Sequence, residues 1–396
     1  MRLVDLFKRS LLAAAIAATG AAQAQDIKLG FNGDLSASPS AQSGKAGVIG
    51  IQAAIDDINA AGGVLGRKLT LVVRDDQSQP PKSIQNMSDL IDNEKVVAVF
   101  GPTNSGNALA WKHIPNQKKV VSMGMIGSGT AITHATAPGA ENYMFRISMV
   151  DREQVAGLVA YAKKSGTTKI GLMGETTGYG QGGLKDLEEI SKLHGLTPLA
   201  TEKFAVSDTD MTSQLNKMKA AGVDTILVWA QGTPTGQLVR SMEKINYFPT
   251  MLSSWAADNI TFFDAAGKTL ASKPLFMRTL VNPTTPAQQK LYDRTVGQLA
   301  APSAFPFVIH GYDAVQLVAA AIKQAGGTDG SKMREALENL SAPVQGVKKT
   351  YVKPFSKDQH EALTAADLAF VKWEGDKLVP HTDAIVKSLT AADFKR

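Results

Sequence analysis

From residue 26 onward, short apolar runs alternate with longer segments in which apolar residues recur every three or four positions. The short runs are typical of buried strands and the longer segments of amphipathic helices. The expected strands are residues 27–31, 69–75, 96–100, 120–123, 169–173, 199–204 and 225–229. The expected helices are residues 44–61, 82–92, 108–116, 151–164, 183–194, 211–221 and 236–245. This alternation predicts mostly parallel sheets with helices on both faces.

The alternation restarts near residue 151, so we expect two α/β units in one chain of 396 residues. Further helices are expected at 287–298, 312–325 and 331–340, and a terminal strand pair at 366–373 and 377–380. No low-complexity linker separates the halves. The predicted fold class is α/β, with two doubly wound lobes.

Composition narrows the possible functions. Hydrophobic residues make up 44% and charged residues 20% of the chain, as in an ordinary globular protein. The net charge of +6 is spread out, with no basic run between aromatic residues, which argues against a nucleic acid partner. The absence of cysteine excludes disulfides and thiolate metal sites. The chain has no G-x-S-x-G or H-E-x-x-H motif, and its six histidines lack metal-ligand spacing. We therefore expect no enzyme, no metal and no cofactor.

The first 24 residues have the pattern of a secretory signal peptide. Arg2, Lys8 and Arg9 precede an apolar run at 11–18, and the run leads to the small-x-small sequence Ala22-Gln23-Ala24. We expect cleavage after Ala24 and export to the periplasm.

Two turns rich in Gly, Ser and Thr follow neighbouring expected strands, at residues 101–106 and 122–133. Open α/β sheets hold ligands at the carboxyl ends of their strands, and a helix start there offers N–H groups to a carboxylate. Ser105 and Ser128 could add hydroxyl donors. Ordinary helix capping explains the same residues equally well.

A third turn, residues 178–183, fits the dinucleotide pattern G-x-G-x-x-G, and Glu202 stands about twenty residues beyond it. However, three residues separate the preceding strand from the first glycine, where a tight turn is expected. Dinucleotide binding is therefore the weaker interpretation.

Taken in order, several segments resemble the leucine/isoleucine/valine-binding group of periplasmic substrate-binding proteins of ABC importers. They are GIQAAIDDINAAGGVLGRKLTLVVRDDQS, FGPTNSG, FRISMVDREQVAGLVAYA, YGQGG and HGYDAVQLVAAAIKQAGG. The likeness covers nearly all of residues 26–380.

The resemblance implies a periplasmic-binding fold of type I, with two lobes joined by three hinge crossings near 145–148, 275–279 and 350–355. The implied first lobe is 25–146 plus 278–351, and the second is 147–277 plus 352–396, after the signal peptide at 1–24. It also implies a ligand cleft between the lobes and an ABC permease as partner. We expect a monomer. A sensor module is an alternative, although no signalling domain is recognisable.

Family contacts imply a binding site on the matching residues. Ser105, beside Asn104, would donate to a ligand carboxylate, as would Gly127 and Ser128. Tyr179 would face the cleft from the second lobe.

Three positions depart from the amino-acid-binding pattern. Ser43 replaces a large aromatic residue, Gln231 stands near a missing tyrosine, and Trp255 replaces the acid that pairs with the ligand ammonium. Burying an ammonium without a counter-charge is costly. Our hypothesis is an aromatic or other hydrophobic carboxylate ligand. Asp258 or Glu175 could still supply the charge, so a branched-chain or other hydrophobic amino acid remains the alternative.

Overall fold

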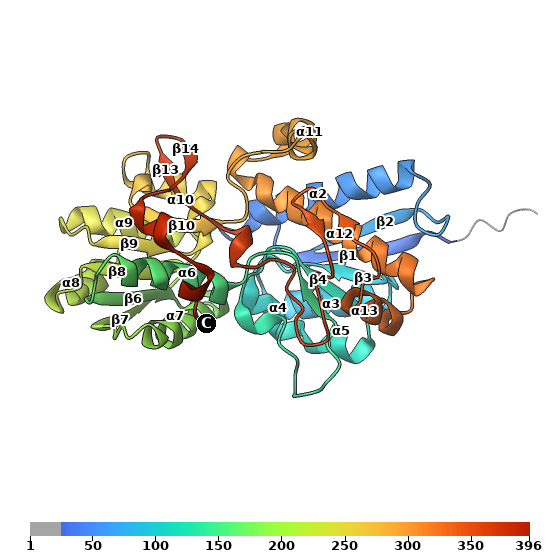
Figure 1. The fold of residues 1–396 in the computed structure, drawn as a ribbon, viewed down its shortest axis with the longest axis horizontal. Coiled ribbons are helices and arrows are strands. Elements are labelled where there is room, and N and C mark those ends of the chain that lie inside the picture. The colour runs from blue at the N-terminus through green and yellow to red at the C-terminus, as the bar shows by residue number, and fades with distance from the viewer. Residues whose placement is uncertain (1–24) are drawn as a thin grey trace, which may run out of the picture.

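The computed structural model describes residues 25–396, which form two α/β lobes lying side by side (Figure 1). The expected signal peptide, residues 1–24, lies outside the described residues. The sheet of the first lobe is fully parallel, in the order β2-β1-β3-β4-β5. Its strands are β1 (Ile27–Gly33), β2 (Leu69–Asp75), β3 (Ala98–Phe100), β4 (Val121–Gly124) and β5 (Met144–Arg146).

The sheet of the second lobe has the order β14-β13-β10-β9-β8-β6-β7. Five of its strands are parallel, and β13 and β14 complete it as an antiparallel pair. The strands are β6 (Ile170–Glu175), β7 (Ala200–Phe204), β8 (Thr225–Trp229), β9 (Thr250–Ser253), β10 (Pro274–Arg278), β13 (Ala369–Glu374) and β14 (Lys377–Pro380). The predicted α/β class with two lobes is confirmed.

Helices cover both sheets. They are α2 (Ala41–Ala60), α3 (Pro80–Asp92), α4 (Ser105–Trp111), α5 (His113–Lys118), α6 (Asp151–Lys164), α7 (Gly178–Leu193), α8 (Thr212–Ala220), α9 (Gly232–Lys244), α10 (Ile260–Ala266), α11 (Pro286–Thr295), α12 (Phe305–Ala325), α13 (Gly330–Glu338) and α14 (Ala384–Ser388). The single helix expected at 108–116 is in fact two, α4 and α5. Pro115 explains the break, because it cannot donate to the carbonyl of Trp111 and its ring crowds that carbonyl.

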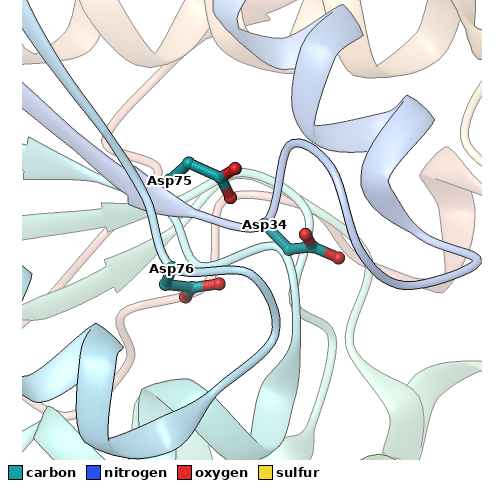
Figure 2. Close-up of side chains that lie close together, drawn as sticks. All are labelled: Asp34, Asp75 and Asp76. Carbon is teal, nitrogen blue, oxygen red and sulfur yellow. The ribbon is translucent and has the colours of Figure 1, made fainter.

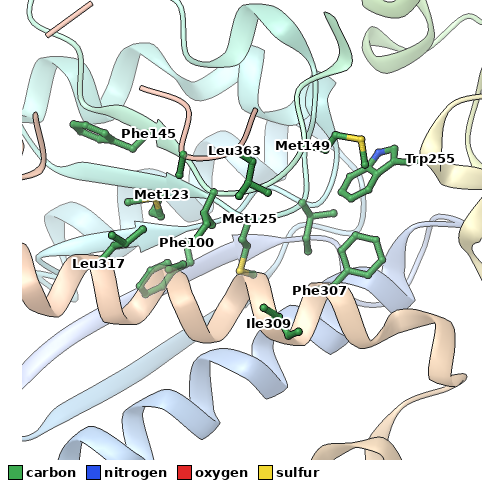
Figure 3. Packing of buried hydrophobic residues seen from close by; sticks show 14 of the residues in the cluster. Phe100, Met123, Met125, Phe145, Met149, Trp255, Phe307, Ile309, Leu317 and Leu363 are labelled. Atoms are coloured by element: carbon green, nitrogen blue, oxygen red, sulfur yellow. The ribbon is translucent and has the colours of Figure 1, made fainter. Parts of the chain in front are cut away.

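Helix α12 forms the centre of the first-lobe core. It runs beneath the sheet, and Leu317 lies near Phe100 and Met123 (Figure 3). Residues 302–325 are long and apolar enough to cross a membrane, but 83% of their most apolar stretch is buried in the protein. This composition therefore reflects a core helix.

The chain passes between the two sheets three times: after β5, after β10 and before β13. An isolated parallel bridge pairs Arg146 with Glu361, so the chain still runs beside the end of β5 at residue 361. The short hairpin of β11 (Val344–Gln345) and β12 (Thr350–Tyr351) precedes that bridge. The residue boundaries of the lobes given above stay a prediction.

Candidate functional site

The cleft lies where the two sheets direct the carboxyl ends of their strands toward each other. Strand order reverses beside β1 in the first sheet and beside β6 in the second. Crevices at such reversals are the usual ligand sites of open α/β sheets. The eight residues singled out from the sequence all line this one cleft: Ser43, Asn104, Ser105, Gly127, Ser128, Tyr179, Gln231 and Trp255. Their contacts with a ligand remain a proposal.

The cleft is narrow. Its cavity measures about 40 Å³, whereas a single water needs about 10–15 Å³ on the same kind of measure. Phe307, Asp258 and Asn259 also line it. A cavity of this size suits a flat or compact ligand.

Ser105 occupies the first position of α4 and is 2% exposed. Its Oγ accepts the amide N–H of Gly129 at 3.0 Å, which leaves the hydroxyl proton free to be donated. A Cβ on Gly129 would lie 2.9 Å from the Cβ of Ser105, so the glycine is needed for this close approach. Because α4 has only seven residues, its dipole adds little, and a carboxylate here would depend on individual donors.

The turn after β4 supplies one backbone donor, but not the expected one. The N–H of Gly127 already donates to the carbonyl of Pro102 at 3.0 Å. The N–H of Ser128 has no hydrogen-bond partner among residues 25–396. We therefore move the backbone donor expected at Gly127 to Ser128.

We expect Ser105→Ala to weaken binding of a carboxylate ligand by about 1–3 kcal/mol, because a buried acceptor on the ligand would lose its donor. Calorimetric titration with benzoate and with leucine measures this change under either ligand class. Ser122→Ala is the matched control, since Ser122 is a buried serine on neighbouring β4 whose hydroxyl has no partner within the described chain. Equal dissociation constants for wild type and Ser105→Ala would remove Ser105 from the site.

Trp255 closes the cleft from the second lobe. Its indole Nε1 donates to Ser128 Oγ at 3.1 Å, and its backbone N–H donates to Gln154 Oε1 at 3.0 Å. The ring lies 5.1 Å from the ring of Phe307, at 58° (Figure 3). Tyr179 adds a third aromatic wall. Trp255 thus presents an apolar face at the position where an acid was expected from the family pattern.

The two acids suggested as a replacement counter-charge differ: Glu175 is fully hydrogen-bonded, whereas Asp258 has one carboxylate oxygen, Oδ2, without a hydrogen-bond partner in residues 25–396. Glu175 is fully buried and accepts hydrogen bonds from the backbone and side chain of Gln231 and from Thr177. Burial raises its pKa. Asp258 lines the cleft with Arg278 3.7 Å away, and burial raises the pKa of Asp258 to about 7 despite that cation.

A further acid, Asp151, lies behind Ser128 in the structure, although the sequence analysis did not single it out. Asp151 begins α6, is fully buried, and has one carboxylate oxygen, Oδ2, without a partner in residues 25–396. Its N–H donates to the carbonyl of Ser128 at 2.8 Å. Burial raises its pKa to about 7. From the sequence alone, an acid in the first turn of a helix is expected to interact with the helix dipole. Only the tertiary structure, which puts Asp151 behind Ser128, makes it a candidate site residue.

Direct contacts join the two lobes around the cleft. Ser40 Oγ donates to Gln231 Oε1 at 3.0 Å, and Asn259 Nδ2 donates to Ser43 Oγ at 3.3 Å. Farther out, Thr130 Oγ1 donates to Asp186 Oδ2 at 2.6 Å. These bonds describe a closed arrangement of the lobes.

The glycines of the dinucleotide-like turn lie inside α7. Gly178 is the first residue of that helix, and a Cβ on it would lie 2.8 Å from the Cα of Gly106 in the other lobe. The turn therefore places Tyr179 in the cleft and allows the first residues of α7 and α4 to lie close together. Here the G-x-G-x-x-G pattern serves packing between the lobes and not dinucleotide binding.

Within residues 25–396, one cluster of three carboxylates has the spacing of a cation site: Asp34, Asp75 and Asp76 (Figure 2). Nearby turns and helices already supply donors to all three. Asp34 accepts the N–H groups of residues 36–38, Asp75 accepts those of Leu35 and Gln77, and Asp76 accepts the side chains of Ser83 and Asn107. We interpret the group as stabilising the turns after β1 and β2.

The chain matches the sequence family described as periplasmic binding protein over residues 26–377. It is 24% identical to Leu/Ile/Val-binding protein homolog 3 of Brucella melitensis, over 95% of this chain and 99% of that protein. The isoleucine complex of the substrate-binding protein LivJ from Streptococcus pneumoniae superposes with a TM-score of 0.75 at 24% identity, covering 89% of this chain and 97% of LivJ. A Rhodopseudomonas palustris solute-binding protein in complex with 4-hydroxybenzoate superposes with a TM-score of 0.73 at 19% identity, covering 90% and 95%.

These relatives are solute-binding proteins and not enzymes, which confirms the expectation that the chain has no catalytic role. They act with ABC-type transporters, and their family implies export to the periplasm. The resemblance seen in the sequence is therefore confirmed: this chain belongs to the periplasmic binding protein family and has the type I fold of its structural neighbours.

Proposed function

We propose that the protein captures a small aromatic or other hydrophobic carboxylate in the interlobe cleft and delivers it to an ABC permease after export through a cleaved signal peptide. The observation that carries this proposal is the indole of Trp255, which lies beside Ser128 where an ammonium would need an acid. A ring stacked on the indole suits an aromatic acid. The 4-hydroxybenzoate complex of the Rhodopseudomonas palustris protein supports this ligand class on the same fold.

Capture of an amino acid is the second candidate, because the unpartnered carboxylate oxygen of Asp151 lies behind Ser128. An ammonium that reached it would hold Asp151 ionised, although burial raises its pKa to about 7. The isoleucine complex of LivJ shows that the fold can host such a ligand.

A thermal-shift screen separates the two candidates. A ligand that binds only the folded protein at about 100 times its Kd adds about 2.7 kcal/mol of stability. We expect benzoate-type acids to raise the melting temperature and leucine, isoleucine, valine and phenylalanine to leave it nearly unchanged. Stabilisation by the amino acids alone would refute the aromatic-acid proposal.

The Asp151→Asn variant gives the screen an internal check. If the ligand is an acid without an amino group, the substitution should leave the ranking of ligands as it is, since a neutral amide replaces a carboxyl that does not meet the ligand. If the ligand is an amino acid, the variant should lose binding, because the ammonium would be buried without a counter-charge.

A further inference from the structure

A second and larger cavity lies outside the cleft. It is bounded by α10 and the β13–β14 hairpin of the second lobe and by α11 and the start of α12 of the first lobe. Helices α10 and α11 and the hairpin lie along the upper edge of the molecule in Figure 1. The volume of this outer cavity is about 650 Å³, and small-molecule sites usually measure about 300–1,000 Å³. The outer cavity is therefore large enough to hold a ligand of its own.

The walls of the outer cavity carry two pairs of aromatic rings, one from each lobe. In the second lobe, Phe263 packs against Trp373 with ring centroids 4.8 Å apart. In the first lobe, Tyr292 packs against Phe305 with ring centroids 5.0 Å apart. All four rings line the outer cavity. A ligand that fills this space therefore needs an apolar body.

Arg278 is the one buried charged residue that lines the outer cavity, and it is 1% exposed. Within residues 25–396, its guanidinium makes a single hydrogen bond, from Nη2 to the carbonyl of Ser303 at 2.8 Å. Neither Nε nor Nη1 has a hydrogen-bond partner among these residues, but only Nε is cut off from the surface. An acceptor in the outer cavity can therefore reach Nη1.

The counter-charge of Arg278 is incomplete. Asp258 Oδ2 lies 3.7 Å from Arg278 Nε, which is too far for a hydrogen bond. Burial raises the pKa of Asp258 to about 7, so this carboxyl is protonated in part of the molecules at neutral pH. Asp376 and Lys377 also line the outer cavity, but both are exposed and their charges are opposite. The buried guanidinium thus favours an anionic group on the ligand.

We propose that the outer cavity is a second ligand site, which takes apolar monocarboxylates with the carboxylate on Arg278 Nη1 and the apolar part between the two aromatic pairs. This inference goes beyond the proposed function and does not depend on it, because Arg278 and the four aromatic residues do not line the cleft. Hydrogen bonds between charged groups are about twice as strong as neutral ones. The site should therefore prefer a carboxylate to an alcohol with the same chain.

Octanoate and 1-octanol test this preference on the wild-type protein, each titrated calorimetrically. Octanoate should bind about tenfold tighter than 1-octanol or better, as expected for a hydrogen bond to a charged group. Equal affinities for the two compounds would overturn the proposal, as would the absence of octanoate binding.

The variant Val379→Trp tests whether octanoate binds in the outer cavity. Val379 is half-buried on the edge strand β14 and lines the outer cavity but not the cleft. An indole there would fill part of the space, so octanoate should bind at least tenfold more weakly. The matched control is Val73→Trp on β2, the edge strand of the first sheet, where the valine is 37% exposed. Octanoate binding that is the same in both variants would place octanoate elsewhere and overturn the proposal.

The variant Arg278→Gln tests the residue that holds the carboxylate, because it removes the positive charge and keeps an amide donor. The readout is the ratio of the dissociation constants of 1-octanol and octanoate within one protein, which cancels any general loss of affinity. We expect the preference for octanoate to disappear. Arg240→Gln, at an exposed arginine of the same lobe, should keep it. A preference retained in Arg278→Gln would overturn the role of Arg278. If that variant does not fold, the wild-type titrations and Val379→Trp decide the proposal.

Discussion

Replacing Arg146 with methionine is expected to lower the free energy of unfolding by about 3–5 kcal/mol, because it leaves the carboxylate of Glu361, which is only 17% exposed, without its cation and two buried carbonyls without their donor. The Arg146 side chain is fully buried. Its Nε and Nη2 bond both carboxylate oxygens of Glu361, at 2.7 and 2.6 Å. Its Nη1 donates to the carbonyls of Gly127 and Gly129 at 3.2 and 2.9 Å, so the loss would also loosen the turn that carries Ser128.

Urea denaturation followed by circular dichroism measures this change. Arg74→Met is the matched control, because Arg74 also bonds two carboxylates, Asp89 and Glu94, but its side chain is 33% exposed. Exposed pairs contribute about 0–1 kcal/mol. Similar losses in both variants would contradict a special role for Arg146. The double variant Arg146→Met/Glu361→Leu should recover part of the loss.

Substituting valine for Gly178 is expected to weaken binding about 10- to 100-fold with little effect on folding. A Cβ there would lie 2.8 Å from the Cα of Gly106 across the cleft. Overpacking of this kind costs about 1–3 kcal/mol. Because the two glycines belong to different lobes, it raises the free energy of the closed form only. Binding depends on closure, so the affinity decreases by the same factor.

Titration with benzoate and with leucine gives the affinity, and small-angle scattering gives the degree of closure. The control is Gly182→Val in the same helix, where an added Cβ would meet nothing within 4 Å. We expect wild type and control to contract on ligand addition and Gly178→Val to stay open. Equal affinity and equal contraction in both valine variants would show that the two helix starts do not meet in the bound form.

Local pattern was enough for most of the architecture. Strands β2 and β8, helix α6 and the hairpin strand β14 have the bounds expected from hydrophobic periodicity alone. The helix starts at Gly178 and Phe305 were placed too late, since Gly and Pro count as helix breakers in sequence. In the structure the glycines permit a close approach between lobes, and Pro306 occupies the first turn of α12, where a missing N–H is tolerated.

The candidate cleft could be located from the sequence because Gly- and Ser-rich turns follow strands at their carboxyl ends. The buried charged residues behind the cleft could not be located in this way. Arg146 and Glu361 are 215 positions apart, and Arg278 falls in a short apolar run that was read as a hinge segment. Likewise, nothing local to Asp151 shows that it lies behind Ser128. Such long-range pairs are set by the tertiary fold.

Hydrogen bonds between protein atoms join the lobes directly, as between Ser40 and Gln231 or Ser43 and Asn259. Part of the free energy that stabilises the closed form therefore comes from contacts within the protein. A bound solute has to supply only the rest of that free energy. A transporter that recognises the shut shape would then meet some carriers without cargo. The strength of these few contacts sets a trade-off between avid capture of scarce solute and wasted encounters at the membrane.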